Sequence, residues 1–359
     1  MGRYVLRRLL LILPTLLGIM VINFVIIQFA PGGPIEQIVA QSTGVGVSST
    51  QSVSAGGQIS GSSSQSTYSG SAGLPPEMLA ELERQFGFDK PAHERFLQMI
   101  WNYAQFDFGH SYFQDRPVFD LVVERIPVSV SLGLWSLLLI YLIAIPLGIA
   151  KAVRDGSRFD IWTSAIIFTA YAIPGFLLAV MLIVFLAGGT YLDWFPMRGL
   201  VSENFADLTL GGKIADYLWH MALPLTALTI GGFATLTMLT KNSFIEELGK
   251  PFVVTARAKG LGEGRVLYGH VFRNAMLIVI AGMPGAFVGV LFTGALLVEV
   301  IFSLDGLGLL GFDAAIKRDY PILFGTLFVF TFIGLVMHLI GDIVYTLVDP
   351  RIDFEARAA

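Results

Sequence analysis

Cysteine is absent from this 359-residue chain, and charge is scarce: 14% of the residues are Asp, Glu, Lys or Arg. Without cysteine, the chain can build no disulfide and no thiolate nucleophile or thiolate metal site. The formal net charge of −4 argues against nucleic acid as a partner. P-loop, H-E-x-x-H and G-x-S-x-G motifs are also missing. We therefore expect no catalytic site, no metal and no bound cofactor in this chain.

Apolar residues are abundant instead: 54% of the chain is hydrophobic and the mean hydropathy is +0.70. This composition is typical of a protein that crosses the membrane several times. Six apolar runs are long enough to span a bilayer, at about 9–30, 129–150, 162–187, 221–240, 276–300 and 321–348. The intervals between them alternate in charge, so the positive-inside rule predicts six spans with both termini in the cytoplasm. The first run is too long for a signal peptide and is interpreted as an uncleaved span.

The chain is expected to have four parts. These are a cytoplasmic N-terminus and first transmembrane helix at 1–30, a periplasmic loop at 31–128, a five-helix core at 129–348, and a cytoplasmic tail at 349–359. Within the loop, residues 42–73 are almost all small and polar, which predicts a flexible Ser/Gly insert. Residues 74–125 regain apolar side chains and predict a small helical cap, including a helix from His93 to about Tyr103.

Glycine and proline recur inside the predicted spans. The cases are Pro146-Leu-Gly148, Pro174-Gly175, Gly231-Gly232 and Pro284-Gly285. Such residues allow close helix contact or local bending, and we favour contact over a hinge.

The longest polar interval in the C-terminal half lies at 241–275 and predicts a cytoplasmic knob. Pro251 suits the first position of a helix, and two turns can follow it up to Lys259. Gly260, Gly262 and Gly264 predict the end of that helix, after which a second short helix can form. A compact knob of this kind is suited to docking into a partner.

Three polar or glycine-rich features near the membrane have competing interpretations. His338 and Asp342 lie four residues apart in the last span, so they form either a proton relay or a structural hydrogen bond between helices. Glu299 ends the fifth span and is expected to meet water on the outer side. The string Gly306-Leu-Gly308-Leu-Leu-Gly311 matches a dinucleotide fingerprint but follows no strand, so we expect a tight outer loop.

The polar interval resembles the cytoplasmic EAA loop of ABC-transporter permeases. The residues that stand where the peptide-permease branch carries T-A-R-A-K-G are Thr255, Ala256, Arg257, Ala258, Lys259 and Gly260. The general family has Glu at the position of Val254 and Leu-Pro at Phe272-Arg273, and this chain has neither. The resemblance implies that these six residues couple the chain to an ATPase subunit. Arg257 and Lys259 would pair with its acidic groups, unless they serve only as positive-inside charges.

Other stretches extend the resemblance over nearly the whole chain. Those similar to the B-type permease of dipeptide and oligopeptide importers are Arg7-Arg8-Leu-Leu, Ala30-Pro-Gly-Gly33, Gly87-Phe-Asp-Lys-Pro91, Arg273-Asn-Ala275, Arg318-Asp-Tyr-Pro321 and Asp349-Pro-Arg-Ile352. Those that resemble the Yej-type oligopeptide and microcin C importers are Lys151-Ala-Val, Gly156-Ser-Arg-Phe-Asp160, Thr237-Met-Leu-Thr-Lys-Asn-Ser-Phe244 and the Ser/Gly insert.

This resemblance implies an all-α polytopic permease of the type I ABC importer fold in the bacterial inner membrane, with six transmembrane helices and a periplasmic insert. The chain would form half of a pore for oligopeptides, with microcin C-like peptides as one candidate cargo. It implies as partners a homologous second permease, two P-loop ATPase subunits that bind ATP and Mg²⁺, and a periplasmic peptide-binding protein. The alternative is a proton-coupled secondary peptide transporter that uses His338 and Asp342.

Overall fold

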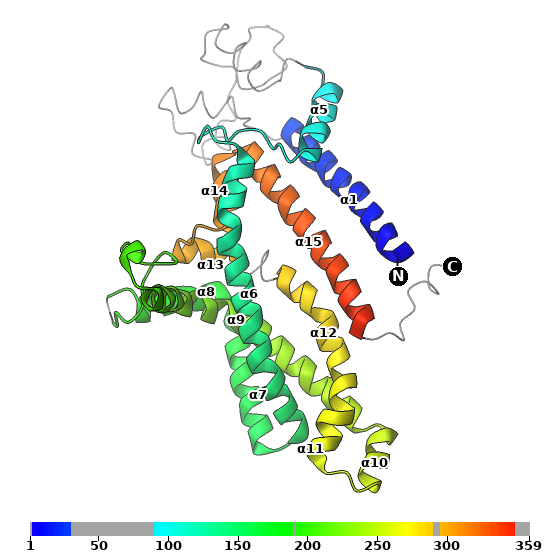
Figure 1. Cartoon of the computed structure of the whole chain (residues 1–359). Helices are drawn as coiled ribbons and strands as arrows, with labels where there is room; N and C mark the ends of the chain where they lie inside the picture. The colour runs from blue at the N-terminus through cyan, green and yellow to red at the C-terminus, as the bar shows by residue number, and fades with distance from the viewer. Residues whose placement is uncertain (1, 30–89, 190, 290–294, 349–359) are drawn as a thin grey trace, which may run out of the picture. The chain divides into compact units, whose positions relative to one another are not determined.

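A computed structural model describes residues 2–29, 90–189, 191–289 and 295–348. In these ranges the chain is built from helices and connecting turns, and its β-pairing is limited to one isolated bridge between His110 and Pro117. Figure 1 shows the helices coloured along the chain. The predicted Ser/Gly insert, the start of the predicted cap and the predicted tail lie outside the described residues.

Long apolar helices dominate the described chain. Five are long and apolar enough to cross a membrane: Val5–Ile26 in α1 (Gly2–Phe29), α6 (Val118–Val153), α9 (Leu210–Leu248), Glu263–Gly289, and Tyr320–Val344 in α15 (Tyr320–Val348). A sixth candidate is the bent pair α7 (Arg158–Tyr171) and α8 (Gly175–Leu186). These helices confirm an all-α fold with five to six apolar spans.

Two predicted spans are interrupted. The run at 162–187 is not one straight helix, because α7 and α8 meet at an angle of 89°. Pro174 explains the break: it lacks an N–H group and disfavours helical backbone at Ile173. The run at 276–300 divides into α12 (Phe272–Gly289) and α13 (Ala295–Phe302), with 290–294 outside the described residues.

Two helices are much longer than the apolar runs that predicted them. α6 starts at Val118 rather than near 129, and α9 extends from Leu210 to Leu248. The hydroxyl of Thr209 accepts a hydrogen bond from the N–H of Gly212 and so caps the start of α9. At 1.5 Å per residue, the 39 residues of α9 extend about 58 Å, beyond the roughly 30 Å hydrocarbon core of a bilayer.

Close packing between α6 and α9 depends on glycine. A Cβ atom at Gly148 would lie 2.6 Å from the Cβ of Thr240, and one at Gly232 would lie 2.6 Å from Cδ1 of Ile140. Pro284 packs against a glycine of another helix: a Cβ at Gly341 of α15 would lie 2.8 Å from the proline ring. Gly148 and Gly232 thus have the predicted contact role, whereas the chain bends at Pro174 and a Cβ at Gly231 or Gly285 would meet no atom within 4 Å.

The chain divides into two compact units. The larger unit comprises 1–12, 122–312 and 329–359, and the smaller comprises 13–121 and 313–328. In the smaller unit, α5 (Ala92–Ala104) matches the predicted amphipathic helix. The rings of Tyr103 and Phe328 meet edge to face at 5.3 Å, and the hydroxyl of Ser111 donates to Oδ2 of Asp319 at 2.6 Å. This unit thus has its own aromatic and polar contacts.

Candidate functional site

The polar interval at 241–275 begins with the last turns of α9, and the predicted short helix follows as α10 (Pro251–Ala258). Lys250 has extended backbone at the N-cap, and Pro251 occupies the first turn. At the other end, the N–H groups of Gly260 and Leu261 donate to the carbonyls of Arg257 (2.9 Å) and Ala256 (3.3 Å). This is a Schellman turn, and the φ of +78° at Gly260 is why glycine suits that position. Local sequence therefore determines both ends of α10.

One side of α10 is anchored in the protein and the other is exposed. Val253 and Ala256 are buried in an apolar cluster that includes Phe244 of α9. The opposite side, called the α10 face below, is exposed and consists of Val254, Thr255, Arg257, Ala258 and Lys259. Of the six predicted coupling residues, Ala256 thus belongs to the anchor, while Gly260 forms the exposed turn. The anchor fixes the orientation in which the α10 face is presented.

Arg257 already has a partner within the chain. Its Nε donates to Oε1 of Glu263 at 2.9 Å and its terminal nitrogen to Oε2 at 3.0 Å. The hydrogen bonds to Glu263 raise the pKa of Arg257 above its ordinary value, so the guanidinium is charged at any physiological pH. Both side chains are largely exposed, at 44% and 73%. A partner's carboxylate would therefore have to compete with Glu263 for Arg257.

The prediction that the second helix of the knob is short is wrong. α11 (Glu263–Val266), a π-helical turn (Leu267–Val271) and α12 run on as one apolar helix to Gly289. Gly264 lies inside α11 rather than ending a helix. Val266 and Val271 are both fully buried although they are five residues apart. A π-turn brings residues at that spacing to the same side, which explains the irregular turn.

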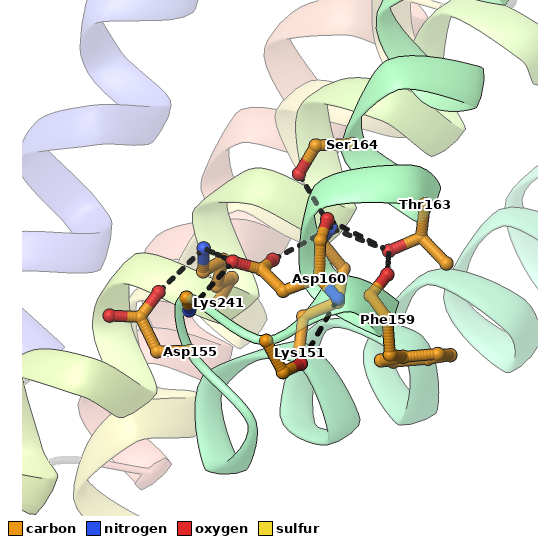
Figure 2. A network of polar contacts seen from close by, with 9 residues as sticks. Lys151, Asp155, Phe159, Asp160, Thr163, Ser164 and Lys241 are labelled. Atoms are coloured by element: carbon orange, nitrogen blue, oxygen red, sulfur yellow. Dashed lines mark hydrogen bonds and ion pairs between the residues drawn. The ribbon is translucent and has the colours of Figure 1, made fainter.

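A buried network of opposite charges lies at the ends of α6, α7 and α9 (Figure 2). The ammonium of Lys151 is fully buried and lies 2.9 Å from Oδ1 of Asp160. It also donates to the hydroxyls of Thr163 (2.8 Å) and Ser164 (2.7 Å). The ammonium of Lys241 lies 2.7 Å from Oδ2 of Asp160 and 2.8 Å from Oδ1 of Asp155. Two lysines and two aspartates therefore balance one another.

The sequence interpretation missed this network. Lys151 lies in the interval after the second apolar run, where the charge pattern predicts an exposed cytoplasmic charge, but its side chain is buried and paired. A signal was nevertheless available. Lys151, Asp160 and Lys241 each come from one of three short stretches that resemble the Yej-type permeases, and the fold brings all three stretches together.

Comparisons with known proteins identify the family of this chain. Residues 144–354 match the family described as "Binding-protein-dependent transport system inner membrane component". The chain is 60% identical over 362 residues to the peptidoglycan transport system permease protein YejB of Agrobacterium fabrum, covering 99% of this chain and 100% of that protein. This chain belongs to the peptide ABC permease family. It is 56% identical to the inner membrane ABC transporter permease protein YejB of Escherichia coli O157:H7, over 99% of this chain and 100% of the relative.

More distant relatives place the permease in the same family. The dipeptide transport system permease protein DppB of Escherichia coli K12 is 32% identical, over 98% of this chain and 99% of the relative. A solved structure of the MetNI methionine ABC transporter shares the fold, with a TM-score of 0.50 and 17% identity over 64% of this chain and 96% of the solved chain. The permease is therefore a multi-pass inner membrane protein with a type I importer fold, and members of this family are pore subunits rather than enzymes.

Asp342 of the permease, one of the two residues in the proton-relay alternative, has a basic partner on another helix. A carboxylate oxygen of Asp342 lies 2.8 Å from a guanidinium nitrogen of Arg8. This ion pair links α15 to the start of α1 within the larger unit. The full-length similarity to ABC permeases supports the ATP-driven interpretation and gives no support to the proton-coupled one.

Glu299 is fully buried, so the prediction that it meets water is wrong. The hydroxyl of Ser129 donates to its Oε1 at 2.7 Å, and the N–H of Leu309 donates to its Oε2 at 2.9 Å. The expected tight loop is instead the start of α14 (Leu307–Lys317). A Cβ at Gly306 would lie 2.3 Å from Oε1, so this glycine leaves space for the carboxylate. The glycine string therefore cradles a carboxylate of its own chain at a helix N-terminus.

Proposed function

We propose that this permease forms half of the pore of an ATP-driven oligopeptide importer and couples to its ATPase through α10. A homologous second permease forms the other half of the pore. Two P-loop ATPase subunits bind ATP and Mg²⁺ on the cytoplasmic side, where both termini of this chain lie. A periplasmic binding protein delivers the peptide from the other side.

The observation that carries this proposal is the construction of α10. A two-turn helix with its apolar side anchored presents Val254 for an apolar contact and Arg257 and Lys259 for charged contacts. Because the anchor joins α10 to α9 and α12, pressure on the α10 face is passed to apolar helices. Packed elements of this kind shift as units between discrete arrangements, which suits a lever driven by ATPase closure.

Short peptides are the cargo that the relatives favour. Their names refer to peptidoglycan, dipeptide and oligopeptide transport, so the chemistry they share is a peptide backbone. We propose the same cargo class for this permease, including peptides released from peptidoglycan and microcin C-like peptides. Uptake of a labelled tripeptide into vesicles that contain the assembled importer and ATP tests this assignment, with ATP-free vesicles as the control.

Co-purification of the cognate ATPase with the permease tests the docking role. Reversal of both charges in Arg257→Glu with Lys259→Glu should abolish capture of the ATPase while the chain still inserts in the membrane. The matched control is Arg154→Glu with Arg158→Glu, which reverses two exposed arginines on the same predicted side of the membrane. This control should retain the ATPase, because neither residue belongs to the α10 face.

The ion pair between Arg257 and Glu263 allows a second test of the docking role. Glu263→Gln removes the competitor for Arg257, so capture of the ATPase should be as strong as in the wild type or stronger. Equal capture by the wild type and the double reversal would show that Arg257 and Lys259 are positive-inside charges only. Loss of capture in Glu263→Gln would show instead that Arg257 acts by holding the turn in place.

A further inference from the structure

The network of Lys151, Asp160 and Lys241 lies beside the anchor of α10. Ile149 and Ala152, which flank Lys151, belong to the same apolar cluster as Val253 and Ala256 of α10. Phe244, three residues after Lys241, belongs to it as well. The short helix therefore rests on the ends of α6 and α9, and these are the ends that the network ties to Asp160 of α7.

Apolar contacts alone would leave these helix ends poorly defined in register, because dispersion and burial are not directional. The hydrogen bonds and ion pairs of the network are directional and can therefore set the register of these helix ends. Lys151 also donates to the backbone carbonyl of Asp160 at 2.9 Å, so it binds the first turn of α7 through both backbone and side chains. The N–H of Gly156 donates to Oδ2 of Asp160 at 3.2 Å, which fixes the turn between α6 and α7. Buried ion pairs of this kind can specify one arrangement even where they add little stability.

Close backbone packing reinforces the same junction. Besides its approach to Thr240, a Cβ at Gly148 would lie 2.8 Å from the carbonyl oxygen of Thr237. Gly148 is three residues before Lys151, and Thr240 directly precedes Lys241. Steric contact thus sets how closely α6 approaches α9, and the charges set the register.

We propose that Lys151, Asp160 and Lys241 are positioning residues that make α6, α7 and α9 move as one body with α10. This inference rests on the proposed coupling role of α10 and deepens it. Without the network, displacement of α10 would be lost as sliding between α7 and α9. With it, the displacement reaches all three helices together.

Because this chain contains no cysteine, spin labels can be placed at chosen positions in it, in an importer assembled with cysteine-free partner subunits. Trp162→Cys on α7 and Glu246→Cys on α9 place two spin labels at exposed positions outside the network. In this otherwise wild-type importer, the measured distances between the two labels should form a single narrow distribution. That distribution should not change when a non-hydrolysable ATP analogue binds. Adding Lys241→Met should broaden the distribution or make it depend on the nucleotide.

Three further variants separate positioning from stability. Lys241→Arg keeps the charge and should restore the narrow, nucleotide-independent distance. Arg154→Met removes an exposed charge from the same turn and should leave the distance as in the wild type. If Lys241→Met fails to insert, Lys241→Met with Asp155→Asn keeps the charges balanced and still removes the link to α9.

Capture of the ATPase by the same samples distinguishes the two levels of the proposal. An unlabelled wild-type chain that captures no ATPase overturns both the coupling role and this inference. ATPase capture together with an unchanged narrow distance in Lys241→Met, or in the charge-balanced variant, overturns only the positioning role. A nucleotide-dependent distance in the labelled parent chain overturns it as well, because the helices then do not move as one body.

Discussion

Two of the ion-pair systems in the permease are built from the same kinds of groups but lie in opposite environments. Arg257 and Glu263 pair beside α10 with 44% and 73% of their side chains exposed. Lys151 and Asp160 pair at the junction of α6 and α7 with 0% and 7% exposed. An exposed pair can exchange its partner with little change in solvation, whereas a buried pair cannot. The difference suggests that the first system is suited to meeting a partner and the second to holding helices in place.

The largest expected effect comes from breaking the buried system. Asp160→Ala leaves the ammonium groups of Lys151 and Lys241 close together without their shared carboxylate. Removal of one partner of a buried pair costs about 3–5 kcal/mol. Thermal melting of the purified permease complex in detergent should therefore shift strongly downward. Asp155→Ala is the matched control, because Asp155 is 56% exposed and contacts only Lys241 among the two lysines, so its shift should be much smaller.

Glu299 is a second buried carboxylate, and its close packing can be disturbed without changing any charge. Gly306→Ala would place a methyl group 2.3 Å from Oε1 of Glu299. Overpacking of this kind costs typically about 1–3 kcal/mol. Gly285→Ala is the control, because a Cβ there would meet no atom within 4 Å. If both variants melt at the wild-type temperature, the carboxylate of Glu299 has room for the added methyl group and is not tightly enclosed.

The α6–α9 junction can also be disturbed without touching any charge. Gly148→Ala should destabilise the complex by about 1–3 kcal/mol, because its methyl group would overlap Thr240. The intrinsic preference of helices for alanine acts in the opposite direction, by up to about 1 kcal/mol. Gly231→Ala has the same preference and an open site, so it should melt at or above the wild-type temperature. A Gly148→Ala variant as stable as Gly231→Ala would contradict the close packing.

The sequence predicted those features that depend on local order along the chain. Apolar runs located the spans, and Pro251 and Gly260 located the ends of α10. Proline shows the limit of such reasoning: Pro174 breaks a helix, while Pro146 and Pro224 lie inside continuous ones. The presence of proline alone therefore does not tell which helix breaks.

The burial of charged groups was likewise beyond local reasoning. Lys241 is 81 residues from Asp160 in the sequence, and Glu299 is 170 from Ser129. Each of these charges looked like the polar end of an apolar run, and only the tertiary fold supplies its partner. The docking role of residues 255–260 stays a prediction, because it depends on a second protein.

The smallest expected change in stability belongs to the exposed pair. Glu263→Gln removes the carboxylate that holds Arg257, yet both groups remain solvated, and exposed pairs contribute only about 0–1 kcal/mol. The melting temperature should therefore stay close to that of the wild type, and Arg257→Gln should behave in the same way. The two variants should differ in ATPase capture, since only Arg257→Gln removes the group offered to the partner. A large loss of stability in either variant would mean that this pair, like that of Lys151 and Asp160, holds the fold, and the contrast between the two systems would no longer separate docking from positioning.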